Sequence, residues 1–294
     1  MESMKPLTIG DIKVSSIIER QGPWRHPADF FLDIDPTAMR ERLLELGPVV
    51  YDADQDMIIV TYQTFILRTR HHVILVDTCT GEDKAPMGPR YDFPRQPWLD
   101  GLAAEGLGFG DIDYVFCTHL HFDHCGWNTR LVDGRWAPTF PNATYLFSRR
   151  EYDFWEAATA AKDDMWDKSW RESCLPVVEA GQARLVDDDY SLDDNIWLTP
   201  SAGHSPGHVC VNIESQGQRA IFTGDLMHHA VQCREPDWCT VFCYDPPAAA
   251  ASRRRLLDQV ADTDITVVPA HFPGATAGHV RPHGDGFDFA FLDD

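Results

Sequence analysis

Four side chains that commonly bind metal ions crowd into six consecutive positions of this sequence. They lie in the segment Thr118-His119-Leu120-His121-Phe122-Asp123-His124-Cys125-Gly126. This segment directly follows a compact apolar run over 114–117, which is typical of a buried strand. The two histidines at 119 and 121 point the same way on an extended backbone, because side chains alternate along a strand. Four such donors exceed what one tetrahedral ion takes from so short a loop, so the segment predicts two metal ions side by side.

Three further potential ligands each follow a predicted strand. His204 comes after the strand predicted over 196–199, Asp225 closes the one over 220–222, and His271 closes the one over 265–268. Each stands near Gly or Pro, where loops present side chains. Strand ends that meet at one edge of a sheet would bring these groups to the first cluster. The seven candidate metal ligands are therefore His119, His121, Asp123, His124, His204, Asp225 and His271.

Strand-like and helix-like segments alternate along the whole chain, which indicates an α/β layered architecture. Asp35 and Pro36 predict the start of a helix over 36–46, because Asp caps a helix N-terminus and Pro fits its first turn. Runs rich in β-branched residues predict strands over 57–67 and 73–76. The acidic stretch 165–195 is expected to be a surface excursion. No linker divides the chain, so we expect a single domain over residues 1–294.

The charge balance and the apolar pattern exclude several classes of function. Lys and Arg total 25 against 46 Asp and Glu, which gives a formal net charge of −21. A surface this acidic repels phosphate backbones and anionic lipids, so we expect neither nucleic acid nor a membrane as partner. No stretch approaches the roughly 18 apolar residues of a membrane span, and the N-terminus lacks the pattern of a secretory signal. The eight cysteines are expected to be free thiols of a cytoplasmic protein.

Taken in order, the motifs resemble one known family. The cluster His119-x-His121-x-Asp123-His124 is followed by Gly203-His204-Ser205-Pro206-Gly207-His208, then by Gly224-Asp225 and Ala270-His271. This series resembles the metallo-β-lactamase superfamily of hydrolases, and the match runs over about two thirds of the chain. The resemblance implies an αββα sandwich, in which two mixed sheets are flanked by helices and the metals lie at the edge between the sheets.

The resemblance also implies how the ligands are shared between two metal ions. One ion would be held by His119, His121 and His204. The second would be held by Asp123, His124 and His271, with Asp225 bridging the two. Asp77 matches an aspartate of the family that holds a ligand imidazole in the correct tautomer. Imidazole and carboxylate suit two zinc ions best, and iron, manganese and cobalt accept the same set.

A hydrolytic mechanism follows from the implied metals. Two zinc-like ions lower the pKa of a shared water to about 7, so that hydroxide is available to attack a carbonyl or phosphoryl centre. Asp123 is the candidate that returns a proton to the leaving group. His228 has two readings. It either lines the pocket and donates to the substrate or leaving group, or it satisfies a local backbone group near the site.

Departures within the family bear on the substrate. Quorum-quenching lactonases often place a Tyr three positions after the bridging Asp, where this chain has His228. The run Gly224-Asp225-Leu226 with a following Ala-Val-Gln is similar to the methyl parathion hydrolase branch, which includes lactonases, aryl esterases and phosphotriesterases. We expect a small-molecule lactone or ester as substrate, with the quorum-quenching type of lactonase favoured. The alternative is a phosphotriesterase or aryl esterase of the methyl parathion hydrolase type.

A more distant alternative is a non-hydrolytic iron protein of the same fold. Iron dioxygenases of the fold typically lose some donors of the second site, whereas all seven are present here. A homodimer is expected only by analogy with the family.

Four aromatic residues are candidates for the pocket wall, namely Trp24, Trp127, Trp238 and Phe272. Trp127 and Phe272 are favoured among them because they stand next to the metal-binding motifs. Packing in the core is the default interpretation for all four.

Overall fold

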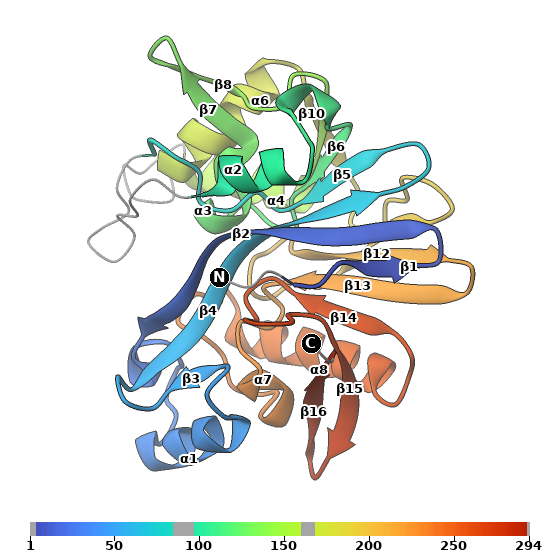
Figure 1. Ribbon diagram of the computed structural model, residues 1–294. Coiled ribbons are helices and arrows are strands. Elements are labelled where there is room, and N and C mark those ends of the chain that lie inside the picture. The colour runs from blue at the N-terminus through green and yellow to red at the C-terminus, as the bar shows by residue number, and fades with distance from the viewer. Residues whose placement is uncertain (1–3, 85–96, 160–167, 293–294) are drawn as a thin grey trace.

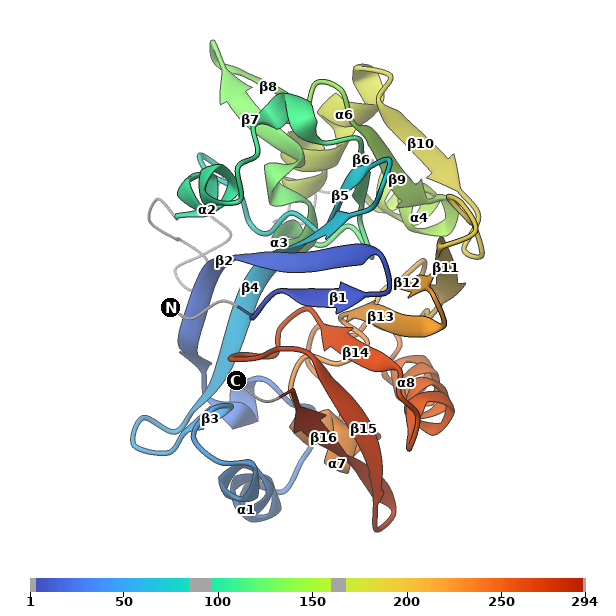
Figure 2. The same ribbon diagram turned by 45° about the vertical axis from the view of Figure 1, so that its right-hand side comes forward.

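Two β-sheets lie face to face at the centre of the structure (Figure 1), a computed structural model that describes residues 4–84, 97–159 and 168–292. Helices cover the outer face of each sheet. Figures 1 and 2 both show α2, α4 and α6 with the first sheet and α7 and α8 with the second. The expected αββα sandwich of two mixed sheets is thereby confirmed.

The first sheet has eight strands, seven of them in the order β1-β2-β4-β5-β6-β9-β10, while β3 pairs with β4. The pairs β5–β6, β6–β9 and β9–β10 are parallel, and the others are antiparallel. The bounds are β1 Leu7–Ile9, β2 Ile12–Arg25, β3 Tyr51–Asp52, β4 Met57–Arg68, β5 Val73–Val76, β6 Tyr114–Phe116, β9 Thr144–Ser148 and β10 Ala183–Val186.

The second sheet has six strands in sequence order, β11 to β16, of which only β13 and β14 pair in parallel. A separate two-stranded sheet is formed by β7 and β8. The bounds are β7 Thr129–Val132, β8 Arg135–Pro138, β11 Ile196–Pro200, β12 Val209–Ser215, β13 Gln218–Gly224, β14 Thr266–Pro269, β15 Gly278–His283 and β16 Gly286–Phe291.

Seven α-helices flank the sheets in the part of the chain that the structure describes. Their bounds are α1 Pro36–Leu46, α2 Trp98–Ala104, α3 Phe122–Cys125, α4 Arg149–Thr159, α6 Leu175–Glu179, α7 Val231–Arg234 and α8 Pro246–Val260. The predicted helix over 36–46 is confirmed, with the Asp35 side chain accepting hydrogen bonds from the amides of Thr37 and Ala38. Short 3-10 turns lie at Pro27–Asp29, Phe109–Asp111 and Gly126–Asn128, and a π-helical turn at Trp170–Cys174.

Alternation along the strands divides the core into layers. Phe65 and Leu67 of β4 pack between the two sheets, whereas Ile66 between them points to the helices outside the first sheet. In the second sheet Phe222 faces the other sheet and Ile221 faces the layer that contains α8. Because successive side chains of a strand point to opposite faces, a strand buried on both faces is apolar throughout. These central strands hold the loops at their ends in place.

The expectation of a surface excursion over 165–195 is wrong for residues 168–186, whereas residues 187–195 form a connection at the surface with no buried residue. Trp170, Cys174 and Val177 are buried in the core outside the first sheet, and β10 adds a parallel strand to β9. The three buried residues are four and three positions apart, which places them on one face of a helix. The acidic residues around them dominated the composition and concealed this apolar face. Residues 165–167 lie outside the described residues.

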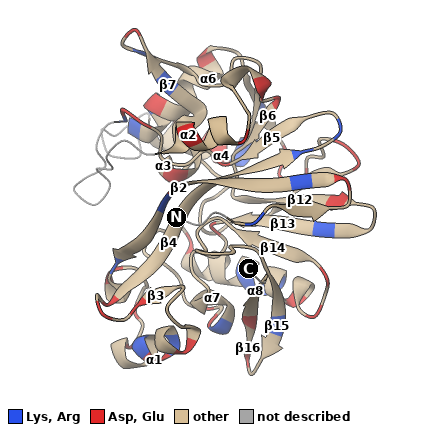
Figure 3. Cartoon of the chain, viewed as in Figure 1, with Lys and Arg blue, Asp and Glu red and all other residues tan. Residues whose placement is uncertain are grey.

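Charged side chains are spread over the molecule. Figure 3 shows Lys and Arg and also Asp and Glu on elements of both sheets and on the helices. Within residues 4–84, 97–159 and 168–292, no helix is both long and apolar enough to cross a membrane.

Candidate metal centre

The candidate ligands gather where several strands end. His119 and His121 follow β6, the α3 helix after them carries Asp123 and His124, and the remaining three follow strands of the second sheet. Those three are His204 after β11, Asp225 after β13 and His271 after β14. Both sheets therefore present donors at a common edge. The structure brings all seven side chains that the sequence singled out into two adjoining groups.

Three imidazoles and one carboxylate form the first group. The Nε2 atom of His204 lies 3.1 Å from Nε2 of His119 and 2.8 Å from Nδ1 of His121. Oδ2 of Asp225 lies 3.2 Å from the same His204 nitrogen. All four side chains are buried. The donor set is the one that the resemblance assigned to the first ion, with the Asp225 carboxylate added.

The second group uses the other oxygen of the same aspartate. Oδ1 of Asp225 lies 3.1 Å from Nε2 of His124 and 3.0 Å from Nε2 of His271. Oδ2 of Asp123 lies 3.5 Å from that His271 nitrogen. Asp225 thus faces one group with each carboxylate oxygen.

The chemistry of the donors fits cations between them. Nε2 of His204 is close to two other ring nitrogens, and one imidazole N–H can satisfy only one such contact. Oδ1 of Asp225 and Nε2 of His124 are buried and have no well-oriented hydrogen-bond partner among the described residues. A cation accepts lone pairs from several nitrogens and oxygens at once. Each group can therefore hold a divalent ion with the side chains that are present.

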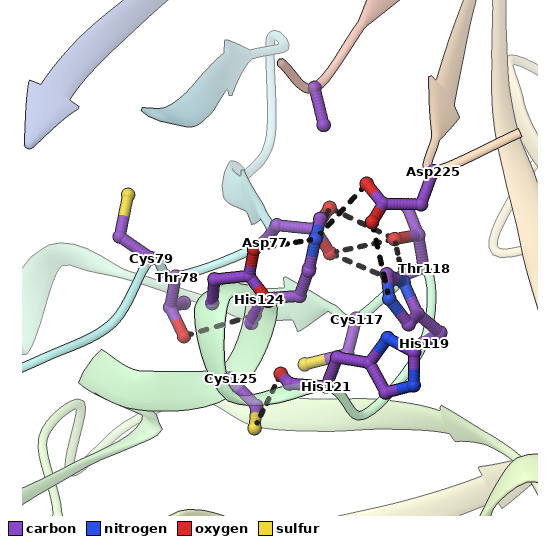
Figure 4. A network of polar contacts seen from close by, with 12 residues as sticks. Asp77, Thr78, Cys79, Cys117, Thr118, His119, His121, His124, Cys125 and Asp225 are labelled. Carbon is purple, nitrogen blue, oxygen red and sulfur yellow. Dashed lines mark hydrogen bonds and ion pairs between the residues drawn. The ribbon is translucent and has the colours of Figure 1, made fainter. Parts of the chain in front are cut away.

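The imidazole nitrogens of His124 and His271 that face away from the donor groups contact other partners. Nδ1 of His124 lies 2.8 Å from Oδ2 of Asp77, and Asp77 Oδ1 accepts the amide N–H of Thr118 at 2.8 Å (Figure 4). Nδ1 of His271 donates to the backbone oxygen of Thr61 at 2.8 Å. Such contacts fix the tautomer and the direction of a ligand imidazole.

Backbone contacts fix the position of Asp225. Its amide N–H donates to Nε2 of His208 at 3.0 Å, and Nδ1 of His208 lies 2.7 Å from Oγ of Ser201. Gly224 before it has φ +48°, and a Cβ atom there would lie 2.6 Å from Oγ1 of Thr118. Glycine is required at this position, since any side chain would push the Asp225 carboxylate away from the two donor groups.

Burial and charge set the protonation states of the clusters. Burial lowers the pKa of His119 and His204 well below the ordinary value, so both rings are neutral as a ligand must be. Burial opposes ionisation of Asp225, yet the neighbouring imidazoles, first His124 and then His271, hold its pKa well below its usual range. The carboxylate that faces both groups is therefore ionised.

His228 lies on the pocket side of the clusters. Its Nε2 atom is 3.1 Å from Oδ2 of Asp225, and the ring is stacked at 14° on that of His271. Neither ring nitrogen has a well-oriented hydrogen bond among the described residues, and both are buried. The side chain therefore does not serve a local backbone group, which was the second reading of this residue.

A pocket with an empty volume of about 390 Å³ opens over the two groups. Aromatic side chains form much of its wall, and Trp24 packs edge-on against Phe30 and Tyr62 with ring centroids 5.9 and 6.0 Å apart. The residues that line it are Trp24, Phe30, Val60, Tyr62, His121, Phe122, Asp123, His204, Asp225, His228, Phe242 and His271.

The aromatic wall differs from the one that the sequence favoured. Trp24 lines the pocket, but Trp127 stacks on Trp98 in the core outside the first sheet. Phe272 is fully buried in the core around α8, and Trp238 packs against that core. Proximity to a motif in sequence misled the choice, because side chains at 127 and 272 point away from the metal-binding edge. Phe30, Tyr62 and Phe242 had no signal in spacing or composition that could have found them.

Two buried carboxylates near the site were also missed. Glu151 of α4 contacts the segments that carry His119, His121 and His204, and Glu19 of β2 contacts the loop after Asp77. Both stand in ordinary strand or helix patterns with no motif around them.

Three comparisons relate the chain to known proteins. The sequence profile of a family described as the metallo-beta-lactamase superfamily matches residues 60–271. An N-acyl homoserine lactonase of Bacillus thuringiensis is 29% identical over 152 residues, which is 51% of this chain and 52% of that protein. The matched region thus spans about half the length of this relative.

Solved structures are similar over almost the full length. The hydrolase AbOPH of the beta-lactamase superfamily is 21% identical with a TM-score of 0.83, covering 100% of this chain and 99% of the other. AidC, a dizinc quorum-quenching lactonase with the product N-hexanoyl-L-homoserine, is 22% identical with a TM-score of 0.84, covering 99% and 98%. At these identities the likeness shows the shared fold.

Proposed function

The chain belongs to the metallo-beta-lactamase superfamily, and we propose that it is a metal-dependent hydrolase that opens lactones or cleaves esters of small apolar acids. One observation carries the proposal. The two oxygens of Asp225 face two separate donor groups at the floor of a pocket with aromatic walls. This arrangement suits a site for two divalent ions under a bound apolar substrate.

The donor groups assign the ligands. His119, His121 and His204 would hold one ion and Asp123, His124 and His271 the other, with Asp225 shared. Two ions held by these residues would supply hydroxide near neutral pH and would polarise the substrate carbonyl. Zinc is the proposed metal, since imidazole and carboxylate suit it best, and iron, manganese or cobalt would accept the same donors.

Two side chains of the pocket wall are proposed to act on the substrate. His228 lines the pocket, and its Nδ1 atom has no hydrogen-bond partner among the described residues, so the ring can donate a hydrogen bond to the acyl oxygen or to the ring oxygen of the substrate. Asp123 also lines the pocket and can pass a proton to the leaving alkoxide when the C–O bond breaks. The product is a hydroxy acid, which releases one proton to solution.

The favoured substrate is a lactone with an apolar side chain, such as an N-acyl homoserine lactone. Trp24, Phe30 and Phe242 offer apolar and aromatic surface to an acyl chain beside the reacting carbonyl. The Bacillus thuringiensis relative and AidC are both lactonases by name, which supports this substrate class.

A pH-stat assay tests the proposal. The zinc-loaded protein is offered acyl-homoserine lactones, simple γ- and δ-lactones, aryl esters, a phosphotriester and a penicillin, before and after chelation. We expect chelator-sensitive proton release that is fastest with lactones. The variant His119→Ala should lose this activity. His71→Ala should keep it, because His71 is exposed and is not one of the candidate ligands. Full activity of His119→Ala would refute the mechanism.

The same panel tests the alternative. His228 stands where the lactonase resemblance expects a tyrosine, which favours an aryl esterase or phosphotriesterase instead. Turnover of aryl esters or the phosphotriester alone would establish that alternative, and silence across the whole panel would contradict both.

A further inference from the structure

The backbone of His228 is held by one buried side chain. Oε1 of Gln232 accepts the amide N–H of His228 at 2.7 Å and that of His229 at 3.3 Å. The Gln232 side chain belongs to α7 and is buried. A side-chain oxygen that accepts amides a few residues away fixes the local path of the backbone. Gln232 therefore determines how the chain runs between Asp225 and α7.

The other end of the Gln232 amide group is held as well. Nε2 of Gln232 donates to the backbone oxygen of Trp238 at 2.8 Å, and Nη1 of Arg253 donates to the same oxygen at 2.9 Å. A carbonyl oxygen has two lone pairs and can accept both donors. Because both ends of its amide group are bound in the interior, Gln232 cannot turn away without leaving a buried polar group unpaired.

Arg253 of α8 joins the two ends of the segment 226–238. Its Nε atom donates to the backbone oxygen of Leu226 at 2.8 Å, at the start of the segment. Its Nη1 atom donates to the backbone oxygens of Pro236 and Trp238 at the end of the segment. The Arg253 side chain is fully buried. The segment is thus closed at its base by Arg253 and braced inside by Gln232.

These contacts decide which of two adjacent histidines faces the pocket. His228 lines the pocket, with its ring centroid 4.7 Å from that of His204. His229 lies on the other side of the backbone, where its Nε2 atom donates to the backbone oxygen of Val50 at 2.8 Å. A backbone rotation that turned His228 away from the pocket would break the hydrogen bonds of both amides to Gln232.

We propose that Gln232 is a positioning residue of the hydrolytic reaction, which holds His228 where its ring can donate to the substrate, and that Arg253 keeps Gln232 in place. The proposal rests on the proposed function, in which His228 acts on the substrate. Gln232 is not among the residues that line the pocket, so it acts only through His228. A displacement of about 1 Å in such a group can lower the rate roughly 100-fold.

Steady-state kinetics of Gln232→Met tests the proposal. Methionine has a similar volume, but it neither accepts the two amides nor donates to Trp238. With the substrate of the pH-stat panel that the wild type hydrolyses fastest, we expect kcat per zinc-loaded site to fall roughly 10- to 100-fold. An unchanged kcat would overturn the proposal.

The matched control is Gln182→Met. The Gln182 side chain also donates to backbone oxygens, those of Phe140 and Ala143 at 2.9 Å each, and it lies outside the pocket-lining residues. This variant should lose stability and keep the kcat of the wild type. An equal fall of kcat in both glutamine variants would show that Gln232 has only a general structural role.

A double-mutant cycle shows whether Gln232 acts through His228. In the variant His228→Gln, the further change Gln232→Met should lower kcat by less than about 2-fold, because no imidazole is left to position. Arg253→Lys keeps the charge but lacks the planar fork that reaches several carbonyl oxygens. It should also lower kcat only while His228 is present, and it provides the test if Gln232→Met does not fold. Losses that add in full would contradict the proposal.

Amide hydrogen exchange tests the contact without any catalytic activity. In the zinc-loaded wild type the amides of His228 and His229 are protected by the Gln232 oxygen, so both should exchange at least about 10-fold faster in Gln232→Met. Unchanged exchange of both amides would overturn the proposal. If the wild type hydrolyses nothing in the panel, the proposed function fails, and the exchange rates still decide whether Gln232 holds this backbone.

Discussion

The carboxylate of Glu151 on α4 accepts the amide N–H of Gly207 at 2.9 Å, and Gly207 lies in the loop between β11 and β12. Its other oxygen accepts the amide N–H of Leu120 at 3.1 Å. Leu120 lies between the candidate ligands His119 and His121. One side chain thus joins the loop that carries His119 and His121 to the loop that carries His204. The relative position of the donors in the first group depends on a residue outside every metal-binding motif.

Replacing Glu151 by Gln should weaken metal binding. The two backbone amides and the Trp155 indole all donate to the carboxylate, so an amide NH₂ in its place leaves a buried donor unpaired, which costs about 1–3 kcal/mol of unfolding free energy. We expect roughly 10-fold lower zinc affinity in a chelator competition. Glu156→Gln on the exposed side of α4 is the control, and equal affinities of the two variants would contradict the role of Glu151.

Asp77→Asn should act on the second group. The carboxylate accepts from His124 Nδ1 and from the Thr118 amide, and a neutral amide holds the imidazole less firmly. We expect a loss of roughly 10- to 100-fold in affinity for one of two zinc ions, measured by titration calorimetry. Asp113→Asn is the control, because the Asp113 carboxylate accepts the Val73 amide at the other end of β5 and Asn can still accept it; this variant should bind both ions normally. Two unchanged binding steps in Asp77→Asn would refute this.

Substitutions at the adjacent residues His228 and His229 should have different effects, the first on catalysis and the second on stability. His228 faces the pocket, whereas His229 donates to the backbone oxygen of Val50 at 2.8 Å and accepts from the Val231 amide. His228→Gln should lower kcat by roughly 10²- to 10⁴-fold with little change in urea unfolding. His229→Gln should lower the unfolding free energy by about 1–3 kcal/mol and leave kcat of the folded enzyme intact. The reverse pattern would show that His228 is structural.

Glu19 should make stability depend on pH. Burial raises its pKa to about 7, against hydrogen bonds from Thr80, Trp127 and Gly81. The folded chain therefore binds this proton more tightly than the unfolded chain, and the contribution of Glu19 to stability is lost as the pH rises from about 4.5 to about 7. Because glutamine does not ionise, Glu19→Gln does not lose stability over this pH range. The unfolding free energy of the variant minus that of the wild type should rise by up to about 3 kcal/mol across this window. If urea unfolding gives the same difference in unfolding free energy between variant and wild type at pH 5 and at pH 8, the prediction is contradicted.

Trp24 should decide the preference for long acyl chains. Its indole provides apolar surface in the pocket, and each buried methylene of a substrate contributes about 0.8 kcal/mol. In Trp24→Ala the ratio of kcat/KM for decanoyl over butanoyl homoserine lactone should fall roughly 10-fold. Trp197→Ala on β11, outside the pocket-lining residues, should keep the wild-type ratio. An unchanged ratio in Trp24→Ala would place the acyl chain elsewhere.

Local patterns predicted much of the fold. The strand over 73–76 and the helix over 36–46 have the predicted bounds, and the helix begins after its Asp35 cap as predicted. These elements depend on contacts between near neighbours in sequence, such as a cap with the first amides of its helix. The expectation of a surface excursion over 165–195 is wrong for residues 168–186, because Trp170, Cys174 and Val177 meet the core only after the helix forms.

The sequence by itself determined the family, the layered architecture and which seven side chains would meet, because short motifs at the ends of buried strands encode them. That these side chains bind two metal ions stays a prediction. Only the tertiary structure decided which residues contact the candidate ligands and their loops, and which residues line the pocket. Glu19 reaches a loop 61 residues further along the chain and Cys243 lies beside a histidine 39 residues before it. Such contacts arise from the packing of distant segments, and packing leaves no regular spacing in a single sequence.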